Sequence, residues 1–357
     1  MPAIHERRRM QLAEVLAAGG LGSALVTTLL NVRYLTGFTG SAAALLVRSD
    51  GCAVMATDSR YALQVEQECP DVPARITRSG RRELAQSIVG WSSGPSGFED
   101  QSLSVAAWRE LPVSVEWAPL GSALDHLRMT KDATELDLLR AACSASDAAI
   151  GEVLSRIRAG VTEVEVARWI DDSLRDRSEG PAFDTIVASG PNGAIPHHQP
   201  TDRPLDHGDL VTMDFGARVA GYHADMTRTV VVGVAAHEWQ GEIYDTVRQA
   251  QQTGCDALAV GRSASEVDAE ARAVITAAGY GEFFGHGLGH GVGLQIHEAP
   301  FLGATSTDKL SASVPVTVEP GIYLPGRGGV RIEDTVVVHS DRVEFLTTTT
   351  RDLLVVG

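Results

Sequence analysis

The feature that most constrains this chain is a segment that predicts an antiparallel β-hairpin carrying two aspartates. Residues 210–230 alternate apolar and polar side chains on both sides of a turn predicted at Arg218 to Gly221. With that turn, Asp214 and Asp225 lie directly opposite each other, with Cβ atoms about 4.5–5.5 Å apart. Two carboxylates this close repel each other unless a cation holds them, whereas the alternative is a polar sheet face with two unrelated, solvated acids.

A second segment repeats this arrangement nearer the C-terminal end. Residues 316–334 contain a turn rich in Gly and Pro, and a symmetric hairpin centred on Gly326 places Glu319 opposite Glu333. Two such pairs in one half of the chain favour cation binding over coincidence. Four inward carboxylates joined by an imidazole predict a site for two divalent ions, because carboxylates suit Mg and Mn, and imidazole suits Zn, Fe and Ni.

Candidate imidazole ligands lie in the stretch 285–293, in which every second residue is glycine. If this stretch is extended, the glycines occupy one face, and His286, Leu288 and His290 occupy the other. Glycine on one face lets backbone or a metal approach closely. His297 follows within twelve residues of His286, and this clustering favours a site over three separate structural histidines.

Three further histidines have different predicted roles. His197 and His198 lie between two prolines on a loop, where a role in a packed core is not expected. His223 comes two residues before Asp225 and would share its face of the hairpin, but we interpret it as structural.

Charge, cysteine usage and motifs exclude several function classes. The formal charge is −16, from 30 Lys and Arg against 46 Asp and Glu, which argues against nucleic acid or an anionic membrane as the main partner. No apolar run reaches the ~18 residues of a membrane span. The four cysteines lie far apart without a C-x-x-C pair, which predicts a reducing, cytoplasmic compartment. The P-loop, H-E-x-x-H and G-x-S-x-G motifs are absent from the sequence.

The length of 357 residues predicts two domains. Residues 1–124 alternate short apolar runs with helical patterns and end on a predicted strand at 113–117, which is typical of an α/β domain with a mixed sheet. In residues 125–357, capping boxes open three predicted helices, and strand pairs rich in Val and Thr lie between and after them. This pattern predicts an α+β domain, in which helices cover one curved antiparallel sheet. The three capping boxes begin at Asp132, Thr162 and Ser263.

The order Asp, Asp, His, Glu, Glu and its surroundings resemble the pita-bread metallopeptidases, in particular the Xaa-Pro peptidases, prolidase and aminopeptidase P. The resemblance covers nearly the whole chain and keeps all five ligand positions. In the first domain the matching segments are 31–41 and 57–61. In the second domain they are Gly190 to His197, Met213-Asp214-Phe-Gly, Ala224-Asp225-Met-Thr-Arg-Thr, His286 to Glu298 (which includes His290 and His297), Val318-Glu319-Pro-Gly-Ile-Tyr and Val330-Arg331-Ile-Glu333-Asp.

The resemblance implies a centre of two divalent ions, with Mn(II) expected first and Co(II) or Zn(II) as alternatives. In such enzymes Asp214 would chelate one ion. Asp225 and Glu333 would bridge both ions, and His290 with Glu319 would complete the second site. Two ions a few ångströms apart lower the pKa of a shared water enough for attack at neutral pH.

The same resemblance implies roles for the remaining polar residues. Glu319 would carry a proton from the attacking water to the leaving proline nitrogen. His197 and His297 would stabilise the tetrahedral intermediate. His286 and Arg331 would line the proline pocket or order the ligands.

The implied substrates are small peptides with proline as the second residue, cleaved after the first residue. The implied role of the first domain is to restrict substrate length and to form a homodimer. Prolidase and aminopeptidase P stay equally open. A methionine-type or general aminopeptidase, a creatinase-like enzyme and an inactive binding or scaffold homologue are the alternatives. The complete ligand set argues against the last two.

Overall fold

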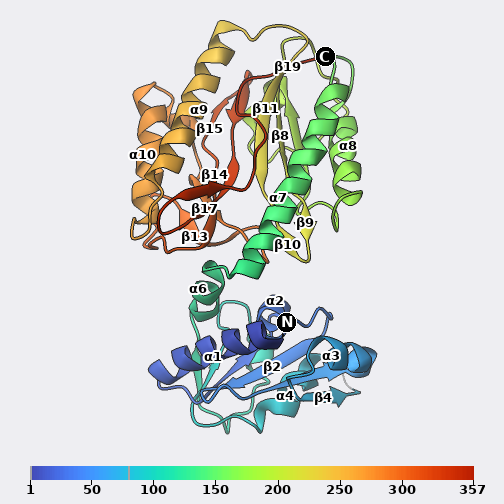
Figure 1. The fold of residues 1–357 in the computed structure, drawn as a ribbon, viewed down its shortest axis with the longest axis vertical. Coiled ribbons are helices and arrows are strands. Elements are labelled where there is room, and N and C mark those ends of the chain that lie inside the picture. Colours follow the sequence, from blue (N-terminus) through green and yellow to red (C-terminus); the bar gives the residue numbers. More distant parts are fainter. Residues whose placement is uncertain (1, 79–80) are drawn as a thin grey trace. The chain divides into compact units, whose positions relative to one another are not determined.

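The computed structural model describes residues 2–78 and 81–357, and the chain divides into two compact units between Arg128 and Met129 (Figure 1). The boundary proposed from the sequence, at 124/125, falls inside helix α6 (Ala123–Met129). The two compact units divide near the end of this helix, whose Arg128 side chain donates to Asn31 and whose Leu127 carbonyl accepts from Tyr34.

The N-terminal unit is built on a six-stranded mixed sheet with the order β4-β3-β2-β1-β5-β6. β1 and β2 pair antiparallel, as do β2 and β3, whereas the outer pairs are parallel. The strands are β1 (Ser23–Val26), β2 (Ala43–Arg48), β3 (Ala53–Asp58), β4 (Ala74–Thr77), β5 (Ser96–Phe98) and β6 (Trp117–Pro119). The helices preceding α6 are α1 (Pro2–Ala18), α2 (Leu29–Thr36), α3 (Ala62–Glu68), α4 (Arg81–Val89) and α5 (Val105–Trp108).

The apolar run in β2 explains how this sheet is covered. Ala44 and Leu46 pack in one cluster with Leu84 and Ile88 of α4, while Leu45, between them on the other face, is also fully buried. A strand with both faces buried is apolar throughout. The strand predicted at 113–117 is wrong, because Pro112 accepts hydrogen bonds that fold this segment into a turn, and β6 begins only at Trp117.

The C-terminal unit contains antiparallel sheets, with one short parallel pair between β11 and β19. One sheet has the order β19-β11-β8-β7 and another the order β13-β12-β14-β17-β18, and two hairpins, β9–β10 and β15–β16, complete the unit. The strands are β7 (Ile186–Ser189), β8 (Leu210–Phe215), β9 (Arg218–Val219), β10 (Tyr222–His223), β11 (Met226–Val232), β12 (Gly289–Gly291), β13 (Glu298–Leu302), β14 (Val314–Val318), β15 (Gly321–Leu324), β16 (Gly328–Arg331), β17 (Asp334–Val338), β18 (Val343–Phe345) and β19 (Val355–Val356).

Four helices flank these strands, α7 and α8 on one side and α9 and α10 on the other (Figure 1). The capping boxes predicted at Asp132, Thr162 and Ser263 are confirmed, because each side chain accepts a hydrogen bond from the backbone three residues on. The sequence analysis did not predict α9. In the part of the chain that the structure describes, every helix is too short or too polar to span a bilayer. The helices are α7 (Ala133–Val153), α8 (Glu163–Arg175), α9 (Glu238–Ala257) and α10 (Ala264–Ala277).

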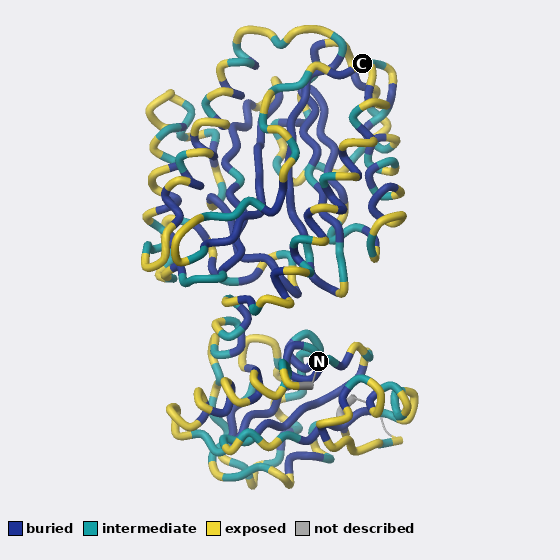
Figure 2. The backbone as a smooth tube through the Cα atoms, viewed as in Figure 1, coloured by how far each residue is buried: buried dark blue, intermediate teal, exposed yellow. Residues whose placement is uncertain are grey.

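The strands are buried between the helices, whose outer turns are exposed (Figure 2). Met213 and Phe215 of β8 pack in the cluster with α7 and α8, and Ile332 packs in the cluster with α9 and α10. Because side chains alternate along a strand, Asp214 and Glu333, next to these apolar residues in sequence, point away from the helices. The predicted α+β architecture is confirmed, and the acids lie on the face that the helices leave open.

Candidate metal and catalytic site

The first predicted hairpin forms, but its pairing differs from the prediction. Asp214 lies opposite Thr227 rather than Asp225. The turn consists of two residues, Ala220 and Gly221, with φ angles of 45° and 77°, and two left-handed residues close a hairpin tightly. The register therefore shifts by two residues. An even shift preserves the face, so both aspartates still project to the same side.

The second hairpin has the predicted register. Val318 pairs with Asp334 on one side, and Gly321 pairs with Arg331 on the other. Glu319 and Glu333 lie between these two pairings and therefore face each other. Each hairpin thus presents its acids to the same open face.

Glycine permits the strand that carries His290 to lie close to its neighbours. A Cβ on Gly289 would collide with the carbonyl oxygen of Thr317, and one on Gly291 would collide with that of Ala299. Only glycine tolerates this approach, since any larger side chain would push the strands apart. The alternating glycines therefore bring the His290 backbone against both neighbouring strands, as the sequence predicts.

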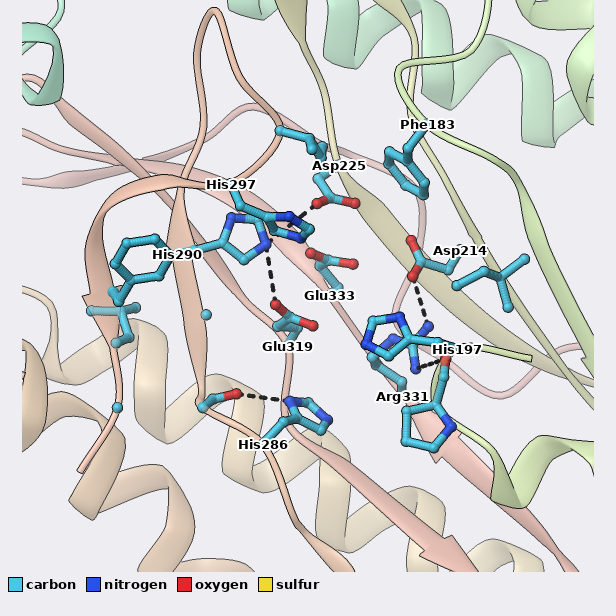
Figure 3. Close-up of a pocket in the computed structure, with 18 of the residues that line it drawn as sticks. Phe183, His197, Asp214, Asp225, His286, His290, His297, Glu319, Arg331 and Glu333 are labelled. Atoms are coloured by element: carbon cyan, nitrogen blue, oxygen red, sulfur yellow. Dashed lines mark hydrogen bonds and ion pairs between the residues drawn. The ribbon is translucent and has the colours of Figure 1, made fainter. Parts of the chain in front are cut away.

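All nine predicted site residues line one cavity of about 560 Å³, a volume within the ordinary range for small-ligand sites. Figure 3 shows these side chains converging on the cavity from strands and loops that are far apart in the sequence. The apolar part of the wall comes from Phe183, Ile186, Ile296, Phe301 and Leu302. The nine polar residues are His197, Asp214, Asp225, His286, His290, His297, Glu319, Arg331 and Glu333.

His290 is oriented by its own strand. Its Nδ1 lies 3.1 Å from the carbonyl oxygen of Gly291, so Nδ1 carries the proton that is donated there. The other ring nitrogen, Nε2, faces Asp225 Oδ2 at 3.6 Å and Glu319 Oε1 at 3.4 Å (Figure 3). An imidazole that is anchored to the backbone through one nitrogen and points the other among carboxylates has the orientation of a metal ligand.

The donor atoms of Asp225, His290 and Glu333 lie within 4.8 Å of one another. Among the described residues, Asp214 Oδ1 and Glu333 Oε1 are buried without a hydrogen-bond partner. Buried carboxylate oxygens are costly unless something compensates them. Oxygen ligands with one imidazole fit a divalent cation, and the two partnerless oxygens are the atoms that such a cation would satisfy.

The charges of the cluster are unbalanced. Burial raises the pKa of Asp225 well above its ordinary value, and the nearby Glu333 raises it further. Burial does the same for the pKa of Glu333, with Glu319 adding to the effect. Burial also raises the pKa of Asp214, although the guanidinium of Arg331 opposes this. Crowded, buried acids of this kind are typical of functional sites.

Glu319 and His290 carry charges that favour each other. Burial alone would raise the pKa of Glu319, but the hydrogen bond and charge of His290 lower it overall. Burial likewise opposes protonation of His290, yet Glu319 raises the pKa of His290 overall. Glu319 is therefore the acid of the cluster that is most readily ionised.

A hydrogen-bonded chain joins Arg331, Tyr323 and His286 along one wall. Arg331 donates to Asp214 Oδ2 at 2.7 Å and to the Tyr323 hydroxyl at 3.0 Å. That hydroxyl lies 2.9 Å from Nε2 of His286, whose Nδ1 is held by the carbonyl oxygen of Gly287 at 2.8 Å. The two predicted substrate-binding residues are thus linked to each other and to Asp214.

Thr227 and Tyr323 belong to this site and were missed by the sequence analysis. The Thr227 hydroxyl donates to Glu333 Oε2 at 2.7 Å and accepts from Arg331 at 3.0 Å. Strand alternation could have identified both residues: Thr227 lies two positions after Asp225, and Tyr323 lies four positions after Glu319.

Of the two neighbouring histidines on the loop, one faces the cavity and the other does not. His197 lines the cavity, and the carbonyl of the preceding residue, Pro196, accepts from Arg331 at 3.3 Å. His198 points elsewhere, with its Nε2 2.9 Å from Glu163. His223 Nδ1 lies 3.0 Å from the carbonyl oxygen of Gly293, in keeping with the structural role predicted for it.

The last predicted histidine, His297, packs edge-to-face on His290, with ring centroids 4.4 Å apart. Burial lowers the pKa of His297, and the proximity of His290 lowers it further. The ring is therefore neutral at neutral pH, with one N–H to donate.

The model of metallopeptidase family M24 matches residues 137–340, which include all nine predicted site residues. The chain belongs to metallopeptidase family M24. A second model, the creatinase/prolidase N-terminal domain, matches residues 8–130. The family resemblance stated from the motifs is therefore confirmed, and membership of the family implies divalent metal ions.

Similar proteins carry two different names. The Xaa-Pro dipeptidase of Pyrococcus horikoshii is 32% identical over 352 residues, covering 96% of this chain and 97% of that protein. The solved structure of Xaa-Pro dipeptidase from Bacillus anthracis has 35% identity and a TM-score of 0.94, covering 99% and 100% of the two chains. That of X-Pro aminopeptidase from Thermotoga maritima has 34% identity and a TM-score of 0.86, covering 94% and 98%. This similarity over both units confirms the predicted pita-bread fold.

Proposed function

We propose that this M24 protein hydrolyses the peptide bond between an N-terminal residue and a following proline. The observation that carries the proposal is the convergence of four carboxylates, His290, His197, His297 and Arg331 on one cavity, in a chain that is similar over most of its length to proteins named Xaa-Pro dipeptidase and X-Pro aminopeptidase.

The residues that would hold two divalent ions are Asp214, Asp225, His290, Glu319 and Glu333. Mn(II) is the first candidate because carboxylates dominate the donor set, and Co(II) or Zn(II) are alternatives. When bound, such ions supply a nucleophilic water at neutral pH and polarise the scissile carbonyl. The partnerless oxygens of Asp214 and Glu333 support this assignment.

The remaining work falls to side chains that hold or move protons. Glu319, whose pKa is lowered by its contact with His290, can accept the proton of the attacking water and pass it to the proline nitrogen. His297 and His197 line the cavity and can donate to the developing oxyanion. Arg331, fixed by Asp214 and Tyr323, orients the wall on which the proline ring would rest.

The preference for proline has a physical basis in the missing N–H of the prolyl amide. A pocket that grips the ring need not satisfy this donor. A secondary amide in the same place would bury an unpaired N–H at a cost of about 1–3 kcal/mol. His286, His297 and Arg331 are the residues proposed to lie near the ring.

Further proposals concern the location of the protein and the roles of its two units. A cytoplasmic location suits four cysteines that are all free thiols. The first unit, proposed from the sequence as residues 1–124, is assigned the restriction of substrate length and homodimer formation. Residues 125–357 are assigned the catalytic site.

Four peptides and the Mn-loaded protein test the activity. We expect cleavage before proline in Ala-Pro, in Ala-Pro-Ala or in both. The ratio of the two rates distinguishes a dipeptidase from an aminopeptidase P. Rapid cleavage of Ala-Ala-Ala would replace the proposal with a general or methionine-type aminopeptidase. Cleavage of N-acetyl-Ala-Pro-Ala would overturn the requirement for a free N-terminus, and no cleavage of any peptide would favour a binding or scaffold homologue.

A further inference from the structure

Glu163 is a buried carboxylate that the proposed reaction does not use. It is the first residue of α8, and its side chain is 0% exposed. The neighbouring capping box is formed by Thr162 and Glu165, so Glu163 is not needed to cap the helix. A fully buried acid normally requires strong compensation.

Within the described part of the chain, the hydrogen bonds that the Glu163 carboxylate accepts come from one loop, residues 189–201. Oε1 accepts from the Ser189 backbone N–H at 2.8 Å, the Ser189 hydroxyl at 2.7 Å and the Asn192 amide at 3.0 Å. Oε2 accepts from the Thr201 backbone N–H at 3.0 Å and the Thr201 hydroxyl at 2.7 Å, and lies 2.9 Å from His198 Nε2. One oxygen therefore holds the beginning of the loop, and the other holds its end.

The loop between these anchors carries His197 into the cavity. Pro196 and His197 both line it, and the Pro196 carbonyl also accepts from Arg331 at 3.3 Å. His198, the next residue, turns the opposite way to reach Glu163. The position of His197 is thus set by a carboxylate that lies outside the cavity lining.

We propose that Glu163 is a positioning residue, which holds the loop of residues 189–201 so that His197 meets the scissile carbonyl. The proposal rests on the proposed peptidase function, in which His197 donates to the oxyanion. It does not make Glu163 a catalytic residue, because Glu163 reaches the reacting atoms only through His197.

The chemistry of the six contacts requires a carboxylate. Although burial opposes ionisation, the hydrogen bonds of Asn192, His198, Ser189 and Thr201 lower the pKa of Glu163 to about 2. Glutamine has nearly the same shape, but whichever way its amide is turned, its NH₂ group faces three donors instead of accepting from them. Glu163→Gln should therefore release one end of the loop while leaving α8 in place.

The test compares Glu163→Gln with Glu165→Gln, a matched change two residues on at an exposed position. Replacing a group that orients a metal ligand typically costs about 10- to 100-fold in metal affinity or activity, and we expect a loss of activity of the same order where the oriented residue is His197. We expect kcat for Ala-Pro to fall by this factor in Glu163→Gln, with KM and bound Mn nearly unchanged, and Glu165→Gln to stay within about two-fold of the parent. Amide hydrogen exchange of residues 189–201 should accelerate in Glu163→Gln only.

A double-mutant cycle with His197→Ala separates positioning from general damage. If Glu163 acts through His197, adding Glu163→Gln to His197→Ala should lower kcat little further. A full additional loss, or an unchanged kcat in Glu163→Gln, overturns the proposal. If Glu163→Gln fails to fold, Thr201→Val removes a single donor from the loop side and should lower kcat in the same direction, and unchanged kcat there overturns the proposal too.

The cycle also distinguishes this proposal from the function on which it rests. An unsubstituted protein that cleaves no Xaa-Pro peptide overturns the proposed function and this proposal together. A protein that cleaves Ala-Pro, but whose Glu163→Gln variant keeps the parent kcat and loop exchange, overturns this proposal alone.

Discussion

Glu333 and Asp334 are adjacent in sequence and equally buried, at 1% exposure each, yet their surroundings differ completely. Asp334 accepts from Arg228 at 2.7 Å, from Thr347 at 2.8 Å and from Gln251 at 2.9 Å. Within the described part of the chain, the Glu333 carboxylate accepts one hydrogen bond, from Thr227, and its Oε1 has no partner.

This difference separates a buried acid that stabilises the fold from a buried acid that belongs to the functional site. Asp334 lies on the helix side of the sheet, where the guanidiniums of Arg228 and Arg351 and two polar groups balance its charge. Glu333 lies on the cavity side among other carboxylates, and burial raises its pKa well above the ordinary value. An acid that the fold leaves unbalanced implies a cation from outside.

The largest effect is expected from neutralising Glu333 and Asp225, the buried acids without a compensating charge, and this change tests the comparison most strongly. Glu333→Gln and Asp225→Asn should abolish peptidase activity, because each removes a carboxylate proposed to hold the metal ions. Metal stabilisation of charge is worth several kcal/mol, so we expect a loss on the order of 1,000-fold or more. Steady-state assays with Mn at saturation measure it, and parent-like turnover in either variant would overturn the ligand assignment. Elemental analysis of the parent should approach two equivalents of metal.

Neutralising the balanced acid should instead damage the fold. Asp334→Asn leaves Arg228, which is 3% exposed, without its carboxylate, and breaking a buried ion pair typically costs about 3–5 kcal/mol. Urea unfolding of the metal-free protein measures this cost. The control is Asp341→Asn, whose exposed pair with Arg342 should contribute almost nothing. Equal stability of the two variants would contradict the structural role of Asp334.

Acid titration extends the comparison to a third buried acid, Glu163. Like Asp334, and unlike Glu333, it has hydrogen-bond partners at both carboxylate oxygens. Its pKa in the folded protein, about 2, lies below the ordinary value of 4.5. The ionised group therefore stabilises the fold above pH 4.5, and this stabilisation is lost as the pH falls towards about 2. We expect Glu163→Gln to be about 3 kcal/mol less stable than the parent at pH 7. Urea unfolding at several pH values should show this gap narrowing below pH 4.5, and a gap independent of pH would be contrary to expectation.

Metal addition sharpens the same comparison without reference to turnover. A ligand that binds only the folded state at 100 times its dissociation constant stabilises it by about 2.7 kcal/mol. Mn(II) should raise the melting temperature of the parent and of Asp334→Asn alike, but raise that of Glu333→Gln much less. Thermal unfolding with and without Mn(II) measures the shift, and an equal shift in Glu333→Gln would place the metal elsewhere.

The smallest effect on activity is expected from breaking the row of hydrogen bonds among Arg331, Tyr323 and His286 on the cavity wall. Tyr323→Phe removes the hydroxyl shared by Arg331 and His286, and one such hydrogen bond contributes about 1 kcal/mol. Activity on Ala-Pro should fall about five-fold, with the metal content unchanged. A loss as large as that of Glu333→Gln would give Tyr323 a direct part in the reaction.

Local pattern predicts much of this protein, because alternation along a strand and capping at a helix start are properties of a few neighbouring residues. The Glu319–Glu333 register and the capping boxes at Asp132, Thr162 and Ser263 follow from such patterns. The face shared by Asp214 and Asp225 also follows, even though their register is wrong by two residues.

The tertiary structure alone decides which partners the buried charges receive. The positive φ angles of Ala220 and Gly221 reset one hairpin, since a two-residue turn and a four-residue loop are both compatible with the same alternation. The contact of Arg331 with Asp214 and the six contacts of Glu163 join residues that are 26 to 117 positions apart in sequence. Such pairings depend on how sheets and helices pack, and packing is set by the whole core rather than by any local pattern.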